Sequence, residues 1–254
     1  RGRMQEAISA PKVGGIVRLT GFVIRTSLVI EGVGALCMLP VFCRDFGASG
    51  IWKAVFHSVS AFCNAGFDLM GTPDTPFVSL TAYRADPAIN LTISALIVVG
   101  GIGFLTWDDV RTNRLHFHRY RLQSKVILTA TALLILLPTL YFFCFEFKGG
   151  TLRERLLLSL FQSVTPRTAG FNTADYTSLS SSGRGLTILL MFIGGSPGST
   201  AGGIKTTTAA VLAANAFAVF RRQKSPEMFG RRMEEKAVYD AAAIFTLYLV
   251  LSLT

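Results

Sequence analysis

An all-α membrane protein is the fold class that the sequence predicts, with a unit of two spans and a short re-entrant helix repeated along the chain. Half of the 254 residues are hydrophobic and only 16% are charged, whereas a soluble domain is about a quarter charged. The apolar residues lie in runs of the length that crosses a bilayer, about 20 residues. One sequence motif also occurs twice, about 100 residues apart.

Five apolar segments are predicted to span the membrane, and the fourth of them is interrupted. They are Thr20–Phe42, Asn90–Trp107, Val126–Phe145, Leu186–Ile193 with its continuation Thr206–Phe220, and Val238–Thr254. The basic residues are concentrated between these spans, in segments 1–19, 108–125 and 221–236. The positive-inside rule places all three basic segments in the cytoplasm, so that the protein crosses the cell membrane several times.

The net charge of +10 does not require a nucleic-acid partner. A polybasic cytoplasmic surface attracts anionic lipid, and we expect membrane lipid as the partner of these residues. The four cysteines lack the spacing of a zinc site or a disulfide framework, and no nucleophile–His–Asp set is visible. We therefore predict neither an enzyme nor a cofactor. The chain opens on Arg1 and stops at Thr254 inside an apolar run, so we expect an internal piece of a longer protein.

The repeated motif reads FHSVSAFCNAGFD at residues 56–68 and FQSVTPRTAGFN at residues 161–172, and one gap aligns the two copies. Each copy includes the end of an apolar segment, Ile51–Phe62 or Leu152–Val164, that is too short to cross a bilayer. A run of this length indicates a re-entrant helix. The repeating unit is therefore span, half-helix, loop, span.

The repeat and the basic segments together define the organisation of the chain. One unit covers residues 20–107, the next covers 126–220 and has a broken second span, and 237–254 is the first span of a truncated unit. If each half-helix enters and leaves on the outer side, both full spans of a unit place their basic ends inside. The topology from charge therefore agrees with the topology from the repeat.

The residues directly after each half-helix indicate a cation filter. Non-helical backbone at membrane depth survives only where protein buries it or a wet cavity adjoins it. Glycine adopts positive φ at low cost, which allows successive carbonyls to point towards one axis and replace the hydration shell of potassium. The predicted potassium-binding residues are Asn64, Ala65, Gly66, Phe67, Thr168, Ala169, Gly170 and Phe171.

Two further features favour this interpretation over a simple tight turn. The C-terminal end of each half-helix carries about half a negative charge, which favours a nearby cation. Hydroxyl groups on both half-helices are expected to tie them to neighbouring loops: Ser58, Ser60, Ser163 and Thr165. A single glycine would indicate a turn or close packing, but two matching copies favour a filter.

The interruption of the fourth span is predicted to be a gating loop. Five glycines and a proline cannot continue a helix, so polar backbone is left at membrane depth, where only a wet cavity can receive it. A loop below the filter closes the pore when it folds inward and opens it when it withdraws. Its residues are Gly194, Gly195, Ser196, Pro197, Gly198, Ser199, Thr200, Ala201, Gly202 and Gly203.

Some of these glycines have competing interpretations. A phosphate-binding loop almost fits Gly198 to Thr206, but Ile204 intervenes and a span precedes it instead of a strand. Gly100-Gly101-Ile102-Gly103 lies within a predicted span, where small residues favour helix packing. Lys205 is a candidate pore-lining residue that either repels cations below the filter or extends to the inner interface, and the sequence leaves both open.

At these motifs the sequence resembles the Trk/Ktr/HKT superfamily of potassium transporters, most closely the KtrB-type membrane subunit, over essentially the whole chain. The resemblance implies four fused potassium-channel-like units with pseudo-fourfold symmetry, of which this chain holds the second, the third and the start of the fourth. It also implies potassium preference at Gly66 and Gly170 and a gating loop at 194–203. A homodimer and a cytosolic nucleotide-binding regulatory ring are the implied partners.

Two other classes of function stay open. A secondary transporter with broken helices around a midplane site would couple a cation gradient to solute transport. The visible repeats share one orientation, whereas many such transporters use inverted ones, so this is the second hypothesis. A membrane enzyme or nucleotide binder that uses the glycine-rich segment is the third.

Overall fold

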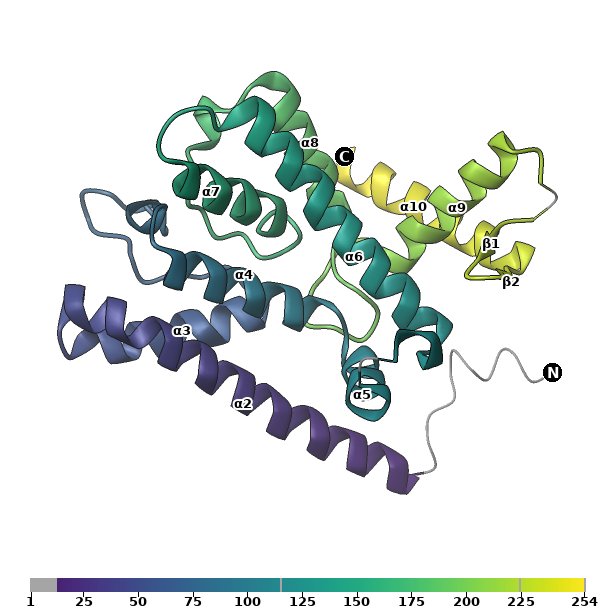
Figure 1. Cartoon of the computed structure of the whole chain (residues 1–254), viewed down its shortest axis with the longest axis horizontal. Helices are drawn as coiled ribbons and strands as arrows, with labels where there is room; N and C mark the ends of the chain where they lie inside the picture. The colour runs from purple at the N-terminus through teal and green to yellow at the C-terminus, as the bar shows by residue number, and fades with distance from the viewer. Residues whose placement is uncertain (1–12, 115, 224, 254) are drawn as a thin grey trace.

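The computed structural model describes residues 13–114, 116–223 and 225–253, and these residues are mainly helical (Figure 1). A short antiparallel hairpin pairs Glu227–Met228 (β1) with Arg231–Arg232 (β2). The main helices are α2 (Val13–Phe46), α3 (Ser49–Phe62), α4 (Pro87–Gly101), α5 (Phe104–Asn113), α6 (Leu122–Tyr141), α7 (Leu152–Val164), α8 (Ser181–Phe192), α9 (Thr206–Phe220) and α10 (Glu235–Leu253). Residues 1–12, Leu115, Lys224 and Thr254 of the predicted segments lie outside the described residues.

Two of the described helices are long and apolar enough to cross a membrane unaided. They are α2, over Val17–Phe46, and α6 with its π-helical continuation, over Leu122–Glu146. Both include a predicted span, and both expose large apolar side chains: Leu28 is 64% exposed and Leu137 is 62% exposed. Apolar side chains that face outward along a whole helix are typical of a lipid-facing surface, because lipid and not water surrounds them.

The prediction of one span over Asn90–Trp107 is wrong in its shape. Helix α4 ends at Gly101, and the chain turns by 96° into α5. Gly103 at the turn has φ +90, and a Cβ there would lie 2.6 Å from the carbonyl oxygen of Pro197. The bend therefore comes from the close approach of a segment almost one hundred residues further along, which no local pattern announces. Gly100 and Gly101 form the end of a helix and not its middle.

The other helix boundaries follow the local sequence closely. Helix α4 begins after Asp86, whose side chain accepts the Ile89 amide at 3.1 Å, with a proline in the first turn. The half-helix α7 has the bounds Leu152–Val164 that the sequence predicts, capped by the Thr151 hydroxyl. The fourth span is broken as expected, because α8 ends at Phe192 and α9 begins at Thr206.

The packing places the two half-helices inside the molecule. Helix α3 packs against α2 and α4, while α7 packs between α4 and α6. Figure 1 shows α7 beside α6 and α4, with the green 193–205 segment between the end of α4 and the lower half of α6. One apolar core joins the two copies, because Phe42, Phe62 and Ile93 of the first belong to the same buried cluster as Phe161 and Phe171 of the second. The loops that follow the half-helices are thereby held near each other.

Candidate functional site

The loops that follow the two half-helices have the same backbone conformation. We name residues 64–68 the first AGF loop and residues 168–172 the second AGF loop. Positive φ occurs at Asn64 (51°) and Gly66 (73°), and again at the aligned Thr168 (73°) and Gly170 (92°). Non-glycine residues seldom adopt positive φ, and residues held there are concentrated at functional sites. The repetition in sequence is therefore also a repetition in backbone geometry.

Equivalent hydrogen bonds hold the two AGF loops to their half-helices. The Ser60 hydroxyl donates to the Phe67 carbonyl at 2.7 Å, and the aligned Thr165 hydroxyl donates to the Phe171 carbonyl at 2.6 Å. At the far end of each loop, a side-chain oxygen of Asp68 or of the aligned Asn172 accepts an amide two residues on. The predicted role of Ser60 and Thr165 as ties between half-helix and loop is confirmed.

The other two predicted hydroxyls bind spans instead of loops, which corrects that prediction. Ser58 donates to the Glu31 carbonyl of α2 at 2.6 Å, and the aligned Ser163 lies 2.7 Å from the Thr139 hydroxyl of α6. A half-helix therefore has one hydroxyl that fixes it to the preceding span and another that fixes its AGF loop.

The two AGF loops are in direct contact. A Cβ built on Gly66 would lie 1.8 Å from the carbonyl oxygen of Ala169, so only glycine fits at this position. A Cβ on Gly170 would meet its nearest neighbour, the Gly66 Cα, at 3.9 Å, which is an ordinary contact. The phenylalanines of the motif differ, because Phe171 is fully buried whereas Phe67 is 70% exposed.

The glycine-rich loop, residues 194–203, is closed by bonds between its own ends. The amide of Gly194 donates to the Ile204 carbonyl at 2.9 Å, and that of Gly195 donates to the Gly202 carbonyl at 3.1 Å. The Thr206 amide donates to the Gly195 carbonyl at 3.0 Å, and its hydroxyl lies 2.8 Å from that of Ser196. Gly194 has to be glycine because a Cβ would lie 1.9 Å from the Gly202 oxygen.

The bend between α4 and α5 is the docking position of the glycine-rich loop. The Ser196 amide donates to the Gly101 carbonyl at 2.8 Å, and the Phe104 amide donates to the Gly198 carbonyl at 2.9 Å. The carbonyls and amides that a helix break leaves without partners are thus satisfied by the loop. The two irregular segments, one from each unit, complete each other.

The glycine-rich loop also contacts the ends of both half-helices. The Thr200 hydroxyl donates to the Phe62 carbonyl at 2.8 Å and lies 3.0 Å from the side-chain nitrogen of Asn64, which donates to it. On the other side, an Nη of Arg167 donates to the Gly194 carbonyl at 3.3 Å. The loop is therefore bound to residues at the start of both AGF loops.

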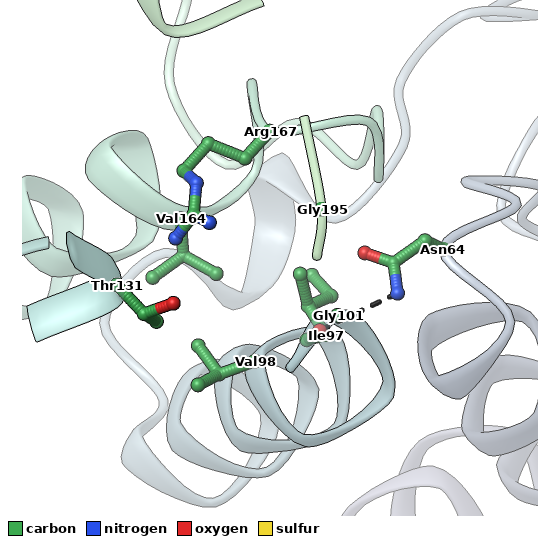
Figure 2. A pocket seen from close by; sticks show the side chains of 8 residues that line it. All are labelled: Asn64, Ile97, Val98, Gly101, Thr131, Val164, Arg167 and Gly195. Carbon is green, nitrogen blue, oxygen red and sulfur yellow. Dashed lines mark hydrogen bonds between the residues drawn. The ribbon is translucent and has the colours of Figure 1, made fainter. Parts of the chain in front are cut away.

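Three polar side chains meet at a small pocket between these segments (Figure 2). Asn64, Thr131 and Arg167 each contribute a buried polar atom that has no hydrogen-bond partner among the described residues. The other lining residues are Ile97, Val98, Gly101, Val164 and Gly195. Neither Arg167 nor Thr131 was among the predicted site residues. A charged side chain within an otherwise apolar motif at membrane depth indicates a functional residue, and this pattern could have identified Arg167 from the sequence.

Lys205 lies at the closing end of the glycine-rich loop. Its ammonium group donates to the Ala201 carbonyl at 2.9 Å, and the residue is half-buried directly before α9. The contact makes Lys205 part of the loop's closure, while repulsion of cations and extension to the interface both remain predictions.

The geometry does not support a phosphate-binding loop. A helix and not a strand precedes residues 194–203, and the amides of Gly194, Gly195 and Ser196 already donate to backbone carbonyls. A phosphate site needs such amides free to point at the anion. Among the described residues, no group of three or more His, Cys, Asp or Glu side chains is arranged to hold a metal ion.

The whole of this architecture has solved and curated counterparts. Residues 5–254 match the family model TrkH, cation transport protein. The chain is 41% identical to the potassium/sodium uptake protein NtpJ of Enterococcus hirae, over 98% of the chain and 55% of that protein. It is 38% identical to the Ktr system potassium uptake protein B of Bacillus subtilis, over 95% of the chain and 54% of that protein.

The fold has a match among solved structures as well. The crystal structure of the potassium transporter TrkH from Vibrio parahaemolyticus superposes with a TM-score of 0.73 at 19% identity, over 95% of this chain and 50% of that one. The chain thus spans about half the length of the relatives it matches. The matched family consists of transport proteins, which agrees with the prediction that the chain is not an enzyme. This mainly helical membrane chain belongs to the TrkH family of cation transport proteins.

Proposed function

We propose that this chain is the central part of a membrane subunit that takes up potassium through a filter of backbone carbonyls, gated by the glycine-rich loop. The observation that carries the proposal is the pair of AGF loops, which share one positive-φ backbone path and touch at Gly66 and Ala169. The relatives are named for potassium or potassium/sodium uptake, which supports the choice of ion.

In this mechanism a potassium ion loses water as it enters a ring of carbonyl oxygens. Residues 64–67 and 168–171 supply two of the strands, and the resemblance to the superfamily implies two more from segments outside this sequence, in a pseudo-fourfold arrangement. The C-terminal ends of α3 and α7 directly precede these strands, so their partial negative charges favour a cation below the filter. The repeated bonds of Ser60 and Thr165 keep the strands in register.

The glycine-rich loop is proposed as the gate. Its contacts with Phe62 and Asn64 on one side and with Arg167 on the other support a position against the inner ends of the two proposed strands. A loop in this position blocks the path of an ion, and withdrawal of the loop opens it. Its five glycines fit this role because glycine adopts a wide range of backbone conformations at low cost.

The surroundings of the pore are also proposals. We place the protein in the cell membrane with segments 108–125 and 221–236 in the cytoplasm, on the positive-inside rule. A homodimer is proposed from the superfamily resemblance. A cytosolic nucleotide-binding regulatory ring is proposed from the same resemblance, and the basic segments offer it a complementary surface.

A secondary transporter is the alternative, and the broken helices favour it specifically. The 96° bend between α4 and α5 and the break between α8 and α9 are features of transporters with midplane sites. Such a protein would couple uptake to a second gradient. The filter proposal predicts instead that potassium moves down its own electrochemical gradient.

The experiment tests the complete protein in a bacterium that lacks its own potassium uptake. Growth at low potassium and the uptake of potassium and sodium are compared for the parent, Gly170→Ser and Gly185→Ser. A Cβ at either glycine meets nothing closer than 3.9 Å, but only Gly170 has positive φ and lies in an AGF loop. Rescue by the parent, with selectivity for potassium weakened by Gly170→Ser alone, supports the filter.

Two outcomes contradict the proposal. Unchanged selectivity in Gly170→Ser removes the second AGF loop from the filter. Uptake that disappears when a sodium or proton gradient is removed, with the potassium gradient maintained, favours the secondary transporter.

A further inference from the structure

Arg167 has no counterpart in the first copy of the repeat. The alignment sets Pro166-Arg167 against the apolar residues before Asn64, where no charged side chain occurs. The residue is only 7% exposed, although a guanidinium is always protonated in proteins. The proposed conduction mechanism makes no use of this charge, so its retention beside the filter needs another explanation.

Its surroundings are unusual for a buried cation. A buried charge is costly unless it is paired and hydrogen-bonded, yet no carboxylate lies within 4.0 Å of Arg167 among the described residues. The guanidinium donates to the Gly194 carbonyl at 3.3 Å. The partial negative charge at the C-terminal end of α7, three residues earlier, also stabilises it.

The pocket supplies the remaining hydrogen-bonding capacity. Figure 2 shows the guanidinium of Arg167 on the same side as Val164 and Thr131, with Asn64 across from it beyond Gly195. The unpaired atoms are complementary, since Nε of Arg167 is a donor, Oδ1 of Asn64 an acceptor, and Oγ1 of Thr131 both. Buried polar groups of this kind are normally joined by water. Such a link would connect Arg167 to the first AGF loop.

Gly194, the partner of Arg167, is the hinge at which the glycine-rich loop begins. Its amide is bound to Ile204, across the base of the loop, and its carbonyl is bound to Arg167. A withdrawal of the loop that carries the Gly194 carbonyl away from the second AGF loop breaks the Arg167 contact. The opposite side of the loop is held by Thr200, on the first copy.

We propose that Arg167 is a positioning residue that fixes the Gly194 hinge to the second AGF loop and favours the closed position of the glycine-rich loop. This inference rests on the proposed function and adds to it a regulation of the gate by the filter. A bond from a charged donor accounts for about 1.5–3 kcal/mol, which corresponds to at least about a tenfold shift between closed and open.

The experiment uses the complete protein, purified and reconstituted in lipid vesicles without a cytosolic partner. Potassium and sodium influx are measured for the parent, Arg167→Gln, Arg167→Lys and the control Arg184→Gln on the exposed face of α8. We expect Arg167→Gln to raise the Vmax of potassium influx about tenfold, while KM and the potassium-to-sodium ratio stay unchanged. Arg167→Lys keeps the charge and restores a low Vmax in part, and Arg184→Gln behaves as the parent.

A second measurement protects the test against a variant that does not fold. Gly202 is exposed, and a Cβ there meets nothing within 4 Å, so Gly202→Cys reports on the loop in a complete protein whose natural cysteines are all replaced. We expect a thiol reagent to label this cysteine several-fold faster when Arg167 is replaced by Lys. Equal labelling rates overturn the proposal, and so does an unchanged Vmax in folded Arg167→Gln.

Failure of this inference is distinguishable from failure of the filter. Gly170→Ser is measured in the same vesicles. Altered selectivity in Gly170→Ser together with an unchanged Vmax in Arg167→Gln overturns the hinge role alone. Unaltered selectivity in Gly170→Ser overturns the proposed filter, on which the hinge role depends.

Discussion

Replacement of Gly66 by alanine tests the contact between the two AGF loops directly. The added methyl group would lie 1.8 Å from the Ala169 oxygen and 2.9 Å from the Ala169 carbonyl carbon. Both are backbone atoms, so no side chain can rotate away to relieve the clash. Gly66 also has φ +73, which costs an alanine roughly 1–2 kcal/mol.

The magnitude follows from adding the two effects. Forcing an extra methyl group into a packed site costs typically 1–3 kcal/mol, which brings the destabilisation by Gly66→Ala to about 2–5 kcal/mol. Gly170→Ala has the same φ requirement but room for the methyl group, with 3.9 Å to the nearest atom. Only the backbone cost, about 1–2 kcal/mol, applies there.

The assay heats the purified complete protein and measures the fraction that still elutes as folded, which gives the temperature of unfolding. At about 2–4 °C per kcal/mol, we expect a fall of roughly 4–20 °C for Gly66→Ala and a smaller one of roughly 2–8 °C for Gly170→Ala. Gly32→Ala is the control, since Gly32 lies within α2 with nothing within 4 Å, and alanine is the better helix former. Equal falls for the two AGF glycines would refute the direct contact of the loops.

The remaining predictions concern the gate and the outer loops. Thr200→Val removes the hydroxyl that joins Phe62 and Asn64, a loss of about 1–3 kcal/mol, so we expect faster basal potassium influx in vesicles. Thr200→Ser keeps the hydroxyl and should behave as the parent, and identical influx in both variants contradicts the contact. The side-chain and backbone bonds from Thr177 lower the pKa of Asp175. The stabilisation by the ionised carboxylate is therefore present above its ordinary pKa and lost as the pH falls below it. An acid titration of Asp175 by NMR should shift upward in Thr177→Val, and an unchanged titration would oppose this assignment.

The repeat explains how much of the candidate site could be predicted from the sequence. The positive φ values at Asn64 and Thr168 and the bonds from Ser60 and Thr165 occur at aligned positions of two similar sequences. Similar residues on similar half-helices form similar local bonds, since these contacts span only a few residues. The internal comparison of two copies thus gave positional information that one copy could not.

The differences between the two copies of the repeat were harder to predict from the sequence. Phe67 and Phe171 occupy the same motif position, yet the first is exposed and the second is buried beside the ring of His57. Arg167 replaces apolar residues of the first copy and binds a loop 27 residues further on. These differences depend on which elements surround each copy, and the motif itself contains no information about its neighbours.

The sequence by itself determined the helices, the two half-helices, the break after Phe192 and the positions of the AGF loops. These features depend on hydrophobic run length, capping residues and glycine content, which act over one or two turns. Only the tertiary structure decided that α4 ends at Gly101, that Gly66 touches Ala169 and that Arg167 binds Gly194. Each of these joins segments about 30 to 100 residues apart, and the pairing of such distant segments is set by the packing of the whole fold, which no local pattern encodes.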